Sequence, residues 1–336
     1  MNLETIAQIS GVSRSTVSRV INNSPNVSSQ VRDRVLKVIR ETNFQPNVAA
    51  RSLAAGSTRI LGLVIPLGVS QMFVDPYFPL LIQGVSSACN ARDYTVMLWL
   101  VEPEYERRIL RQILHSGLID GVIITSTQMD DPLVDALLER SFPCVMVGRP
   151  RPGQEIDFVD VDNVGSAQRA VDHLLKLGRG RIATIAGPQT MTAGVDRLSG
   201  YQIALKQAGL PFDPDLVEAG EFTQAGGFAA MQRLLPANPN AVFAASDAMA
   251  QGAMLAINAA GLRIPQDIAV VGFDDIPLAA HMQPPLTTIR QPIDRMGSQA
   301  VAQLIHRLTD PTGQQPHGVL LPTELTIRSS CGADST

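Results

Sequence analysis

Short apolar runs alternate with amphipathic stretches along residues 60–290 of this 336-residue chain, and this alternation limits the fold more than any other feature. Each run has the length and composition of a strand, and the stretches between the runs have the apolar spacing of helices. Strands that alternate with helices form parallel sheets with helices on both faces. The runs predict strands at 60–65, 95–100, 121–124, 144–147, 158–161, 181–186, 241–244, 268–272 and 286–290.

The alternation occurs twice, so we expect two similar lobes, each a doubly wound parallel sheet. The last helix, at 293–308, and the last strands, at 319–321 and 324–327, follow both sets and would return to complete them. This assigns about 59–161 plus 292–322 to an N-lobe and about 162–291 plus 323–330 to a C-lobe, within a body at 59–336. The other expected helices lie near 80–92, 103–115, 131–140, 164–177, 197–208, 226–235 and 247–260.

Residues 1–45 do not show this alternation, and they predict a small all-α head with a helix-turn-helix. Gly11 stands where the chain must turn with a positive φ, and Ser13 offers an N-cap oxygen to a second helix. Val17 and Val20 would pack against Ile6 and Ala7. A third helix is expected from Ser28, as its cap, to about Thr42.

The other face of the second helix is polar and contains side chains that bond bases and phosphates: Arg14, Ser15, Thr16, Ser18 and Arg19. An ordinary helical hairpin with a polar face is the alternative. The basic side chains of the third helix, at 32, 34, 37 and 40, are interpreted as a solvated face that attracts DNA at long range.

Charge is divided unevenly between the head and the rest of the chain. Residues 1–60 hold eight basic and three acidic side chains, a net of +5, although the whole chain carries −4. A basic head on an acidic body suits a protein that contacts a polyanion at one end. Residues 46–58 form the connection, and a helix there would be too short to be stable alone.

Composition excludes several other classes. The three cysteines are far apart and have no CxxC spacing, which argues against disulfides and zinc. Neither a secretory signal nor a run of spanning length occurs, so we expect a cytoplasmic protein without membrane contact. No HExxH, P-loop, GxGxxG or GxSxG is present, and Asp160 and Asp162 do not begin an EF-hand loop. We therefore expect no enzyme, cofactor or metal.

The chain resembles the lactose-repressor/galactose-repressor family of transcription regulators along nearly its whole length. The matching segments occur in the family's order: 11–22, 46–54, 159–163, 187–188, 196–201, 245–252, 270–275 and 285–291. The resemblance implies a homodimer on a pseudo-palindromic DNA operator and a body like periplasmic sugar-binding proteins. It also implies a repressor of carbohydrate-utilisation genes that a sugar effector, a mono- or oligosaccharide, releases from DNA.

The resemblance assigns roles in DNA binding residue by residue. Arg14, Ser15 and Arg19 match base-reading positions of the family, and an arginine can bond guanine at two atoms. Leu53 matches a leucine that inserts into the minor groove, and DNA together with the partner subunit would order its segment. The remaining matches are phosphate-facing or hinge positions: Ser13, Thr16, Ser18, Asn22, Asn47 and Ala50.

For the effector site, the residues themselves single out Asp274 and Asp275, which follow an apolar run. Ligands bind at the carboxyl ends of parallel strands. The resemblance favours Asp274 as an acceptor of ligand hydroxyls, while a helix N-cap is the alternative for one of the two. Arg197 matches the family's effector-binding arginine, with an interface ion pair as the alternative, and is expected to open a helix. Ser246 stands where many relatives have asparagine, and Asp247 is expected to cap its helix or contact ligand.

Other candidates complete the predicted effector site. Phe222 matches an aromatic that packs on the sugar, while Phe73, Tyr77 and Phe78 follow the first strand of the other lobe. Core packing is the alternative for each of these rings. Gln291 lies at a crossover between lobes, and Arg149 follows the strand at 144–147. A corepressor-dependent regulator and a solute-binding protein are the alternative functions, and dimers are expected to associate no further.

Overall fold

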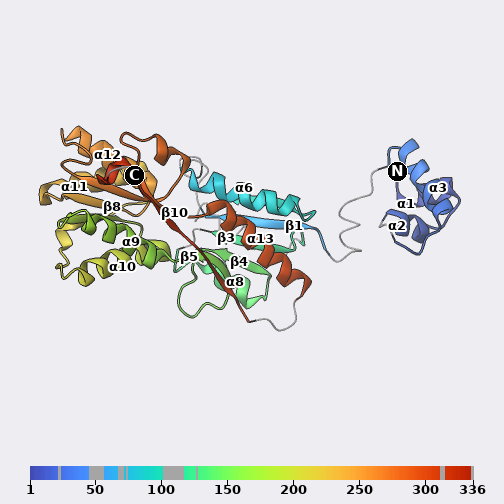
Figure 1. Cartoon of the computed structure of the whole chain (residues 1–336). Helices are drawn as coiled ribbons and strands as arrows, with labels where there is room; N and C mark the ends of the chain where they lie inside the picture. The colour runs from blue at the N-terminus through green and yellow to red at the C-terminus, as the bar shows by residue number, and fades with distance from the viewer. Residues whose placement is uncertain are drawn as a thin grey trace. The chain divides into compact units, whose positions relative to one another are not determined.

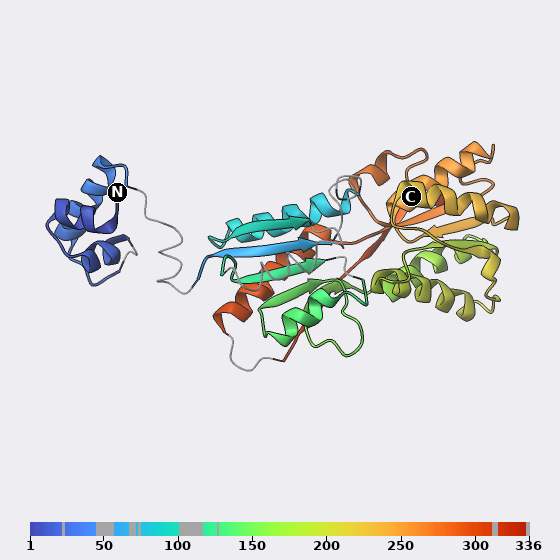
Figure 2. The same ribbon diagram turned by 180° about the vertical axis from the view of Figure 1, so that it is seen from behind.

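The computed structural model divides the chain into two compact units, Met1–Arg59 and Ile60–Thr336. We call the first unit the head and the second the body; Figures 1 and 2 draw both from opposite sides. None of the helices in the described residues is long and apolar enough to cross a membrane. The described residues are 1–21, 24–44, 57–66, 72, 75–100, 117–125, 128–310 and 315–333.

The head contains three helices around a small apolar core. They are α1 (Leu3–Ser10), α2 (Arg14–Ile21) and α3 (Ser29–Glu41). Gly11 has a φ of +64°, which confirms the predicted glycine turn between α1 and α2. The predicted packing of α2 against α1 is also confirmed, because both helices contribute to one core: Ile6, Ala7, Val17, Val20, Val35, Val38 and Phe44.

The caps of α2 and α3 differ. Ser13 Oγ accepts a hydrogen bond from the backbone N–H of Thr16 at 3.2 Å, so the predicted cap of α2 is confirmed. Ser28 occupies the N-cap position of α3, but its side chain makes no capping hydrogen bond there. The position of this cap was predicted correctly and its chemistry was not.

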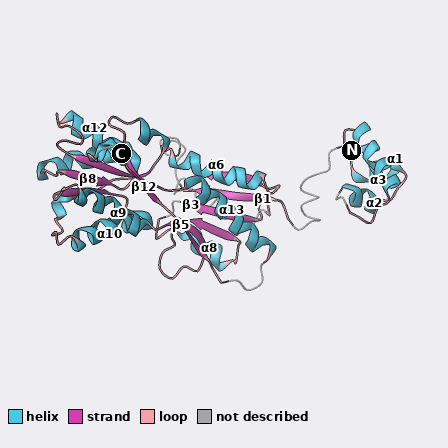
Figure 3. Ribbon diagram, viewed as in Figure 1, coloured by secondary structure: helices cyan, strands magenta, loops and turns pink. Residues whose placement is uncertain are grey.

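The body has two lobes, each built on a six-stranded sheet between helices (Figure 3). The N-lobe sheet has the order β11-β5-β4-β3-β1-β2, and every neighbouring pair is parallel. Its strands are β1 (Ile60–Ile65), β2 (Thr95–Leu100), β3 (Gly121–Thr125), β4 (Cys144–Val147), β5 (Asp157–Val161) and β11 (Gly318–Leu321). Its described helices are α6 (Tyr77–Asn90), α8 (Pro132–Glu139) and α13 (Ile293–Thr309).

The C-lobe sheet repeats this arrangement with the order β12-β10-β9-β8-β6-β7, and only β12 is antiparallel to its neighbour. The strands are β6 (Ile182–Ala186), β7 (Val217–Ala219), β8 (Ala241–Ala244), β9 (Ala269–Asp274), β10 (Thr287–Arg290) and β12 (Glu324–Thr326). The α-helices are α9 (Asn163–Lys176), α10 (Thr192–Gln207), α11 (Gln224–Leu234) and α12 (Asp247–Ala259). Short 3₁₀ turns lie at Pro214–Leu216, Leu235–Ala237, Pro277–His281 and Ser329–Cys331.

Consecutive residues of the central strands face opposite sides of the sheet and are buried in two different cores. In β1, Leu61 and Leu63 pack in the core shared with α6 and α13, while Val64 packs in the other core, under α8. In β8, Phe243 faces the core of α9 and α10, and Val242 faces that of α11 and α12. Strands buried on both faces are apolar at consecutive positions, as a parallel sheet requires.

The chain crosses between the lobes three times: after β5, after β10 and between β11 and β12. The last helix and strands therefore return to complete the two lobes. In Figure 1, α13 lies beside α6, so the late and early parts of the chain pack together in the N-lobe. In each sheet the winding reverses beside the first strand, β1 or β6, and ligands bind at the carboxyl ends of strands at such points.

Several predicted boundaries were wrong. Helix α10 begins at Thr192, so Arg197 lies in its second turn and does not open it. The short edge strand β7 was missed, because three residues with a central glutamate show no apolar run. The expected helix at 103–115 lies outside the described residues.

Glycine at position 84 allows the close contact of α6 and α13. A Cβ added there would lie 2.0 Å from the backbone oxygen of Asp294, which cannot move aside as a side chain would. We expect Gly84→Ala to destabilise the body by about 1–3 kcal/mol, the usual range for overpacking. Gly180→Ala is the control, since no atom lies within 4 Å of its added Cβ. Equal urea midpoints for the two variants would contradict this account.

Candidate functional site

The head presents the predicted DNA-reading side chains on α2. Ser13, Arg14, Ser15 and Arg19 are exposed, and Thr16 and Ser18 are half-buried. Arg19 lies one turn after Ser15, so both are on the face opposite the buried valines of α2. The head therefore keeps this polar face available to an outside partner.

The start of α2 is organised by hydroxyl groups. Ser13 Oγ lies 2.8 Å from Ser15 Oγ and 2.8 Å from Thr16 Oγ1. Arg14 forms an exposed ion pair with Glu4 of α1, with 3.4 Å between Nη1 and Oε1. Exposed pairs contribute little stability, so Arg14 can exchange this partner at small cost. The predicted positions Asn22, Asn47, Ala50, Leu53 and Phe73 lie outside the described residues.

In the body, Arg197 is the centre of a buried polar network. Its side chain is 7% exposed. Nε donates to Asn163 Oδ1 at 2.9 Å, and Nη1 donates to the backbone oxygen of Ala245 at 2.6 Å and lies 3.5 Å from Asp274 Oδ1. The guanidinium also lies over two rings, 3.7 Å from the centroid of Phe273 and 5.7 Å from that of Phe222.

The network continues to both sides of Arg197. Gln291 Nε2 donates to Asp274 Oδ1 at 2.6 Å. On the other side, Asn163 Nδ2 donates to the carboxylate of Asp160 at 3.1 and 3.2 Å. We call Asp160, Asn163, Arg197, Asp274 and Gln291 the Arg197 network. It joins strand β5 of the N-lobe to α10 and β9 of the C-lobe, and two members lie at crossovers.

Backbone strain fixes the orientation of Asp274. Its φ is +121°, and that of Asp275 is +56°. Residues other than glycine rarely adopt such positive φ values. Strain of this kind persists only where surrounding contacts enforce it, and it concentrates at functional sites. The two carboxylates are thereby separated: Asp274 lies in the Arg197 network, and Asp275 bonds Arg290 and Arg328. Neither caps the following 3₁₀ turn, so that alternative is excluded.

Asp75 and Tyr77, at the start of α6 in the N-lobe, interact with charged members of the Arg197 network. Asp75 lies two residues before Tyr77, the first residue of α6, and its Oδ1 accepts the N–H of Tyr77 at 3.0 Å. Burial raises the pKa of the Asp75 carboxyl, and the charge of Arg197 opposes this. Burial and the carboxylates of Asp160 and Asp274 raise the pKa of the Tyr77 phenol. The sequence reasoning identified Tyr77 but missed Asp75, Asp160 and Asn163 as site residues.

The position of the Phe222 ring depends on a neighbouring glycine. The φ of Phe222 is +54°, and a Cβ on Gly187 would lie 2.3 Å from Phe222 Cζ. The ring therefore occupies the space that glycine leaves, close to Arg197. Phe78, by contrast, is 5% exposed and packs in the core beneath α6, so the structure does not bring it to the network.

The side chains of two other predicted residues form hydrogen bonds within the C-lobe. Ser246 Oγ accepts the N–H of Met249 at 3.2 Å and caps α12. Asp247 was expected to cap that helix or contact ligand; instead its carboxylate is completely buried, accepting the N–H of Ile276 and the hydroxyl of Thr288 at 2.9 and 2.5 Å. Burial, followed by the charge of Asp274, raises the Asp247 pKa well above its ordinary value.

Arg149 connects the lobes through a bidentate ion pair with Asp196 of α10, at 2.9 and 2.6 Å. Because the Arg149 side chain is 40% exposed, we expect a modest coupling of about 1 kcal/mol between the two residues. A double-mutant cycle with Arg149→Met and Asp196→Asn, followed by thermal denaturation, measures it. Strictly additive effects of the two substitutions would show that the pair does not stabilise this arrangement of the lobes.

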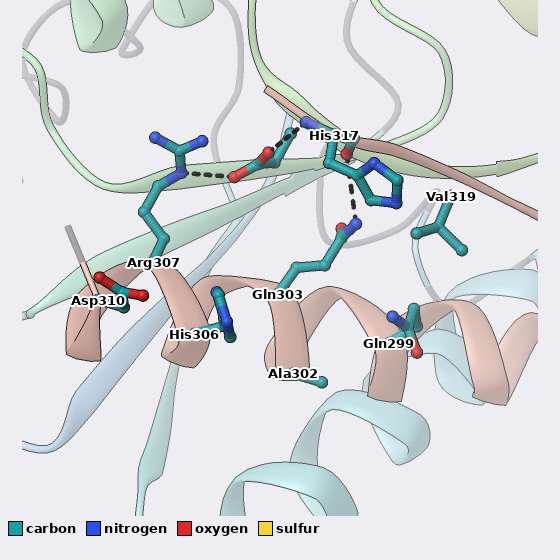
Figure 4. A pocket seen from close by; sticks show the side chains of 9 residues that line it. Gln299, Ala302, Gln303, His306, Arg307, Asp310, His317 and Val319 are labelled. Carbon is teal, nitrogen blue, oxygen red and sulfur yellow. Dashed lines mark hydrogen bonds and ion pairs between the residues drawn. The ribbon is translucent and has the colours of Figure 1, made fainter. Parts of the chain in front are cut away.

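A pocket of about 390 Å³ lies on the N-lobe between α13 and β11 (Figure 4). Its polar side chains form hydrogen bonds and ion pairs mainly with neighbouring groups of the same pocket. Arg307 Nε donates to Asp157 at 2.5 Å, Asp157 accepts the N–H of His317 at 2.7 Å, and Gln303 Nε2 donates to the His317 carbonyl at 3.3 Å. This hollow is therefore explained as the junction of β5, α13 and β11. A second pocket, of about 540 Å³, is lined partly by Gln291.

The environment of Asp274 predicts a pH dependence of stability. Burial raises its pKa to about 7 from an ordinary 3.8, although Arg197 opposes the shift. Between these values the folded protein holds a proton that the unfolded chain releases, so the free energy of unfolding rises as pH falls from about 7 towards 4. Burial also raises the Asp160 pKa, to about 6, in the same direction.

We expect Asp274→Asn to lose part of this dependence. Urea unfolding of both proteins at pH 7.5 and 5.5 (set on either side of about 7) measures the difference, in which contributions from groups that do not interact with Asp274 cancel. An unchanged pH dependence in the variant would contradict the assignment.

Family models and curated relatives match this architecture. The model described as "Bacterial regulatory proteins, lacI family" matches residues 2–47, and "Periplasmic binding protein-like domain" matches 171–331. The HTH-type transcriptional regulator CelR of Thermobifida fusca is 41% identical over 332 residues, 98% of this chain and 97% of that protein. The ribose operon repressor of Escherichia coli K12 is 38% identical over 326 residues, 95% and 97% of the two chains.

Two solved structures are similar over almost the whole chain. A CelR–cellobiose complex has a TM-score of 0.78 and 38% identity, covering 98% of this chain and 99% of that one. The lac repressor dimer bound to operator and an anti-inducer has a TM-score of 0.87 and 26% identity, covering 99% of both. A helix-turn-helix head on such a two-lobed body defines a DNA-binding transcriptional regulator. The chain belongs to the lacI family of bacterial regulatory proteins, as its sequence predicted.

Proposed function

We propose that the protein represses carbohydrate-utilisation genes and is released from its operator by a sugar that binds between the lobes. The Arg197 network carries this proposal, because it brings a rigid guanidinium fork and two carboxylates together from both lobes. Such groups suit the hydroxyls of a sugar, which both donate and accept hydrogen bonds. The complex of CelR with cellobiose supports a sugar and makes cellobiose the first probe.

For the effector contacts we propose Arg197, Asp274 and Gln291 as hydrogen-bonding groups and Phe222 and Tyr77 as apolar walls. Arg149 and Ser246, whose side chains already have partners in the protein, would shape the site around these contacts. Asp75 would add an acceptor from the N-lobe. Nothing in this set forms a nucleophile with an adjacent base, so we propose binding without catalysis.

For DNA binding we propose domains at 1–45, 46–58 and 59–336, with the middle segment as a hinge. In a homodimer, two heads would read the halves of a pseudo-palindromic operator in the cytoplasm. The contacts would come from α2 and from the hinge, where Leu53 would enter the minor groove. The proposed contact residues are Ser13, Arg14, Ser15, Thr16, Ser18, Arg19, Asn22, Asn47, Ala50 and Leu53.

Release would follow from a change in the lobes. A sugar that binds one arrangement of the lobes more tightly shifts the protein towards it, and separating the two hinges would withdraw both leucines. The shift equals the differential affinity of the sugar, typically about 1–3 kcal/mol. Gln291, a proposed ligand contact, lies at the second crossover between the lobes, and this position supports the coupling.

The test is a gel-shift experiment after selection of the operator from random DNA. We expect specific, salt-dependent binding that weakens as salt rises from about 50 to 200 mM, and release on addition of cellobiose or another sugar. Absence of DNA binding at every sequence would overturn the proposal that the protein is a regulator. Tighter binding to DNA in the presence of sugar would show that the sugar acts as a corepressor and does not release the protein.

A further inference from the structure

Three contacts join the start of α10 and the loop before it to the N-lobe. The Met129 N–H donates to the Thr190 carbonyl oxygen at 2.8 Å. Thr192 Oγ1 donates to the Arg149 carbonyl oxygen, also at 2.8 Å. The third contact is the bidentate ion pair between the Arg149 guanidinium and Asp196. We call the three together the interlobe contact, because Met129 and Arg149 follow strands β3 and β4 of the N-lobe, whereas their partners belong to the C-lobe.

The interlobe contact ends at the residue immediately before Arg197, the centre of the Arg197 network. Asp196 and Arg197 are consecutive in α10, and their side chains are 11% and 7% exposed. Consecutive helical positions are about 100° apart, so the two side chains leave α10 in different directions. Holding Asp196 against the N-lobe therefore sets where the Arg197 guanidinium lies relative to that lobe.

The Arg149 guanidinium already uses the edge that makes bidentate contacts. Nε and Nη2 both donate to Asp196, at 2.9 and 2.6 Å. To bond an effector through this edge, Arg149 would have to leave a carboxylate that is 11% exposed without its cation. Removing one partner of such a pair is costly, so Arg149 acts on the site through Asp196 and not by direct contact.

We propose that Arg149 is a positioning residue: through Asp196 it holds Arg197 in the arrangement of the lobes that binds effector. The proposal rests on the proposed function of the Arg197 network as the effector site. Apparent affinity falls in proportion to the fraction of molecules in the binding arrangement, and the interlobe contact raises that fraction. Salt screens a pair that is partly exposed, as the Arg149 side chain is at 40%. Rising salt should therefore weaken the binding of a sugar that carries no charge.

Three variants separate positioning of Arg197 from a general effect on stability. Arg149→Met and Asp196→Asn each remove one charge of the pair, so each should cause a similar loss of affinity and the double variant no greater loss. Arg151→Met is the matched control. Arg151 lies two residues after Arg149, is 39% exposed and pairs with Asp135 at 2.6 Å, but both of these residues belong to the N-lobe. Thermal midpoints establish that all variants fold.

Calorimetry on the full-length protein tests the proposal with cellobiose, glucose and ribose in about 0.1 and 1 M NaCl. We expect wild type to bind at least one of these sugars and to lose about threefold in affinity at the higher salt. Arg149→Met should bind that sugar about fivefold more weakly than wild type at the lower salt and show no salt dependence. Arg151→Met should match wild type in affinity and in salt dependence.

Unchanged affinity in Arg149→Met, or the same salt dependence in this variant and wild type, would overturn the proposal. Tighter binding by the variant would also overturn it, because the pair would then stabilise the arrangement that does not bind effector. If wild type binds none of the sugars, this proposal and the proposal of a sugar effector both fail. A gel shift on the same samples tests DNA binding separately.

Discussion

An Arg19→Ala variant is expected to lose selection of its operator while it keeps full affinity for the effector. Arg19 is exposed on α2, opposite the buried Val17 and Val20, so its truncation leaves the core of the head intact. A lost bidentate contact to a base costs about 1–3 kcal/mol of discrimination in each half-site. Competition gel shifts between operator and random DNA measure this loss, and calorimetry measures effector binding.

Arg34→Ala provides the control within the head. Arg34 is exposed on α3, away from the proposed reading face, so its removal should weaken binding to all sequences equally and reduce the salt dependence. If Arg19→Ala behaves in the same way, Arg19 contacts phosphate and does not select bases. If it also reduces effector affinity, its role is structural.

Substitution of Arg197 is expected to produce a repressor that stays on DNA in the presence of effector. Arg197→Ala removes the donors that connect Asn163, Ala245 and Asp274, and leaves a buried carboxylate without its cationic neighbour. Loss of one partner from a buried ion pair costs about 3–5 kcal/mol. We therefore expect a lower melting temperature of the body, effector affinity reduced about 100-fold or more, and operator affinity within a few-fold of wild type.

Arg197→Lys distinguishes charge from geometry. A lysine ammonium keeps the positive charge but cannot reproduce the planar fork that bonds two groups and lies on the ring of Phe273. Effector affinity should still fall by about tenfold or more. Arg233→Ala, which breaks a surface ion pair with Glu218, is the control and should behave as wild type. Full effector response in Arg197→Lys would mean that only the charge matters.

Much of the fold could be predicted because its information is local. The strands at Ile60–Ile65, Thr95–Leu100, Cys144–Val147 and Ala241–Ala244 have the predicted bounds. Each is an apolar run, as in strands of parallel sheets with helices on both faces. The edge strand β7 and the start of α10 were not predictable in this way: the first is short and half-exposed, and the second has no side-chain cap.

The site was predictable only in part. Arg197, Asp274 and Gln291 were identified, and the structure brings them together. Asp160 and Asn163 were missed because local sequence does not show which side chains meet across lobes. The partner of Arg149 is 47 positions away, so only the folded chain reveals that ion pair.

The central claim is that occupancy of the site between the lobes and occupancy of the operator are coupled in one molecule. The most direct test measures effector affinity with and without saturating operator, and operator affinity with and without saturating effector. Linkage requires both ratios to be the same, and we expect about 5–150-fold, with each ligand weakening the other. An effector that binds equally well to free and operator-bound protein would contradict the account.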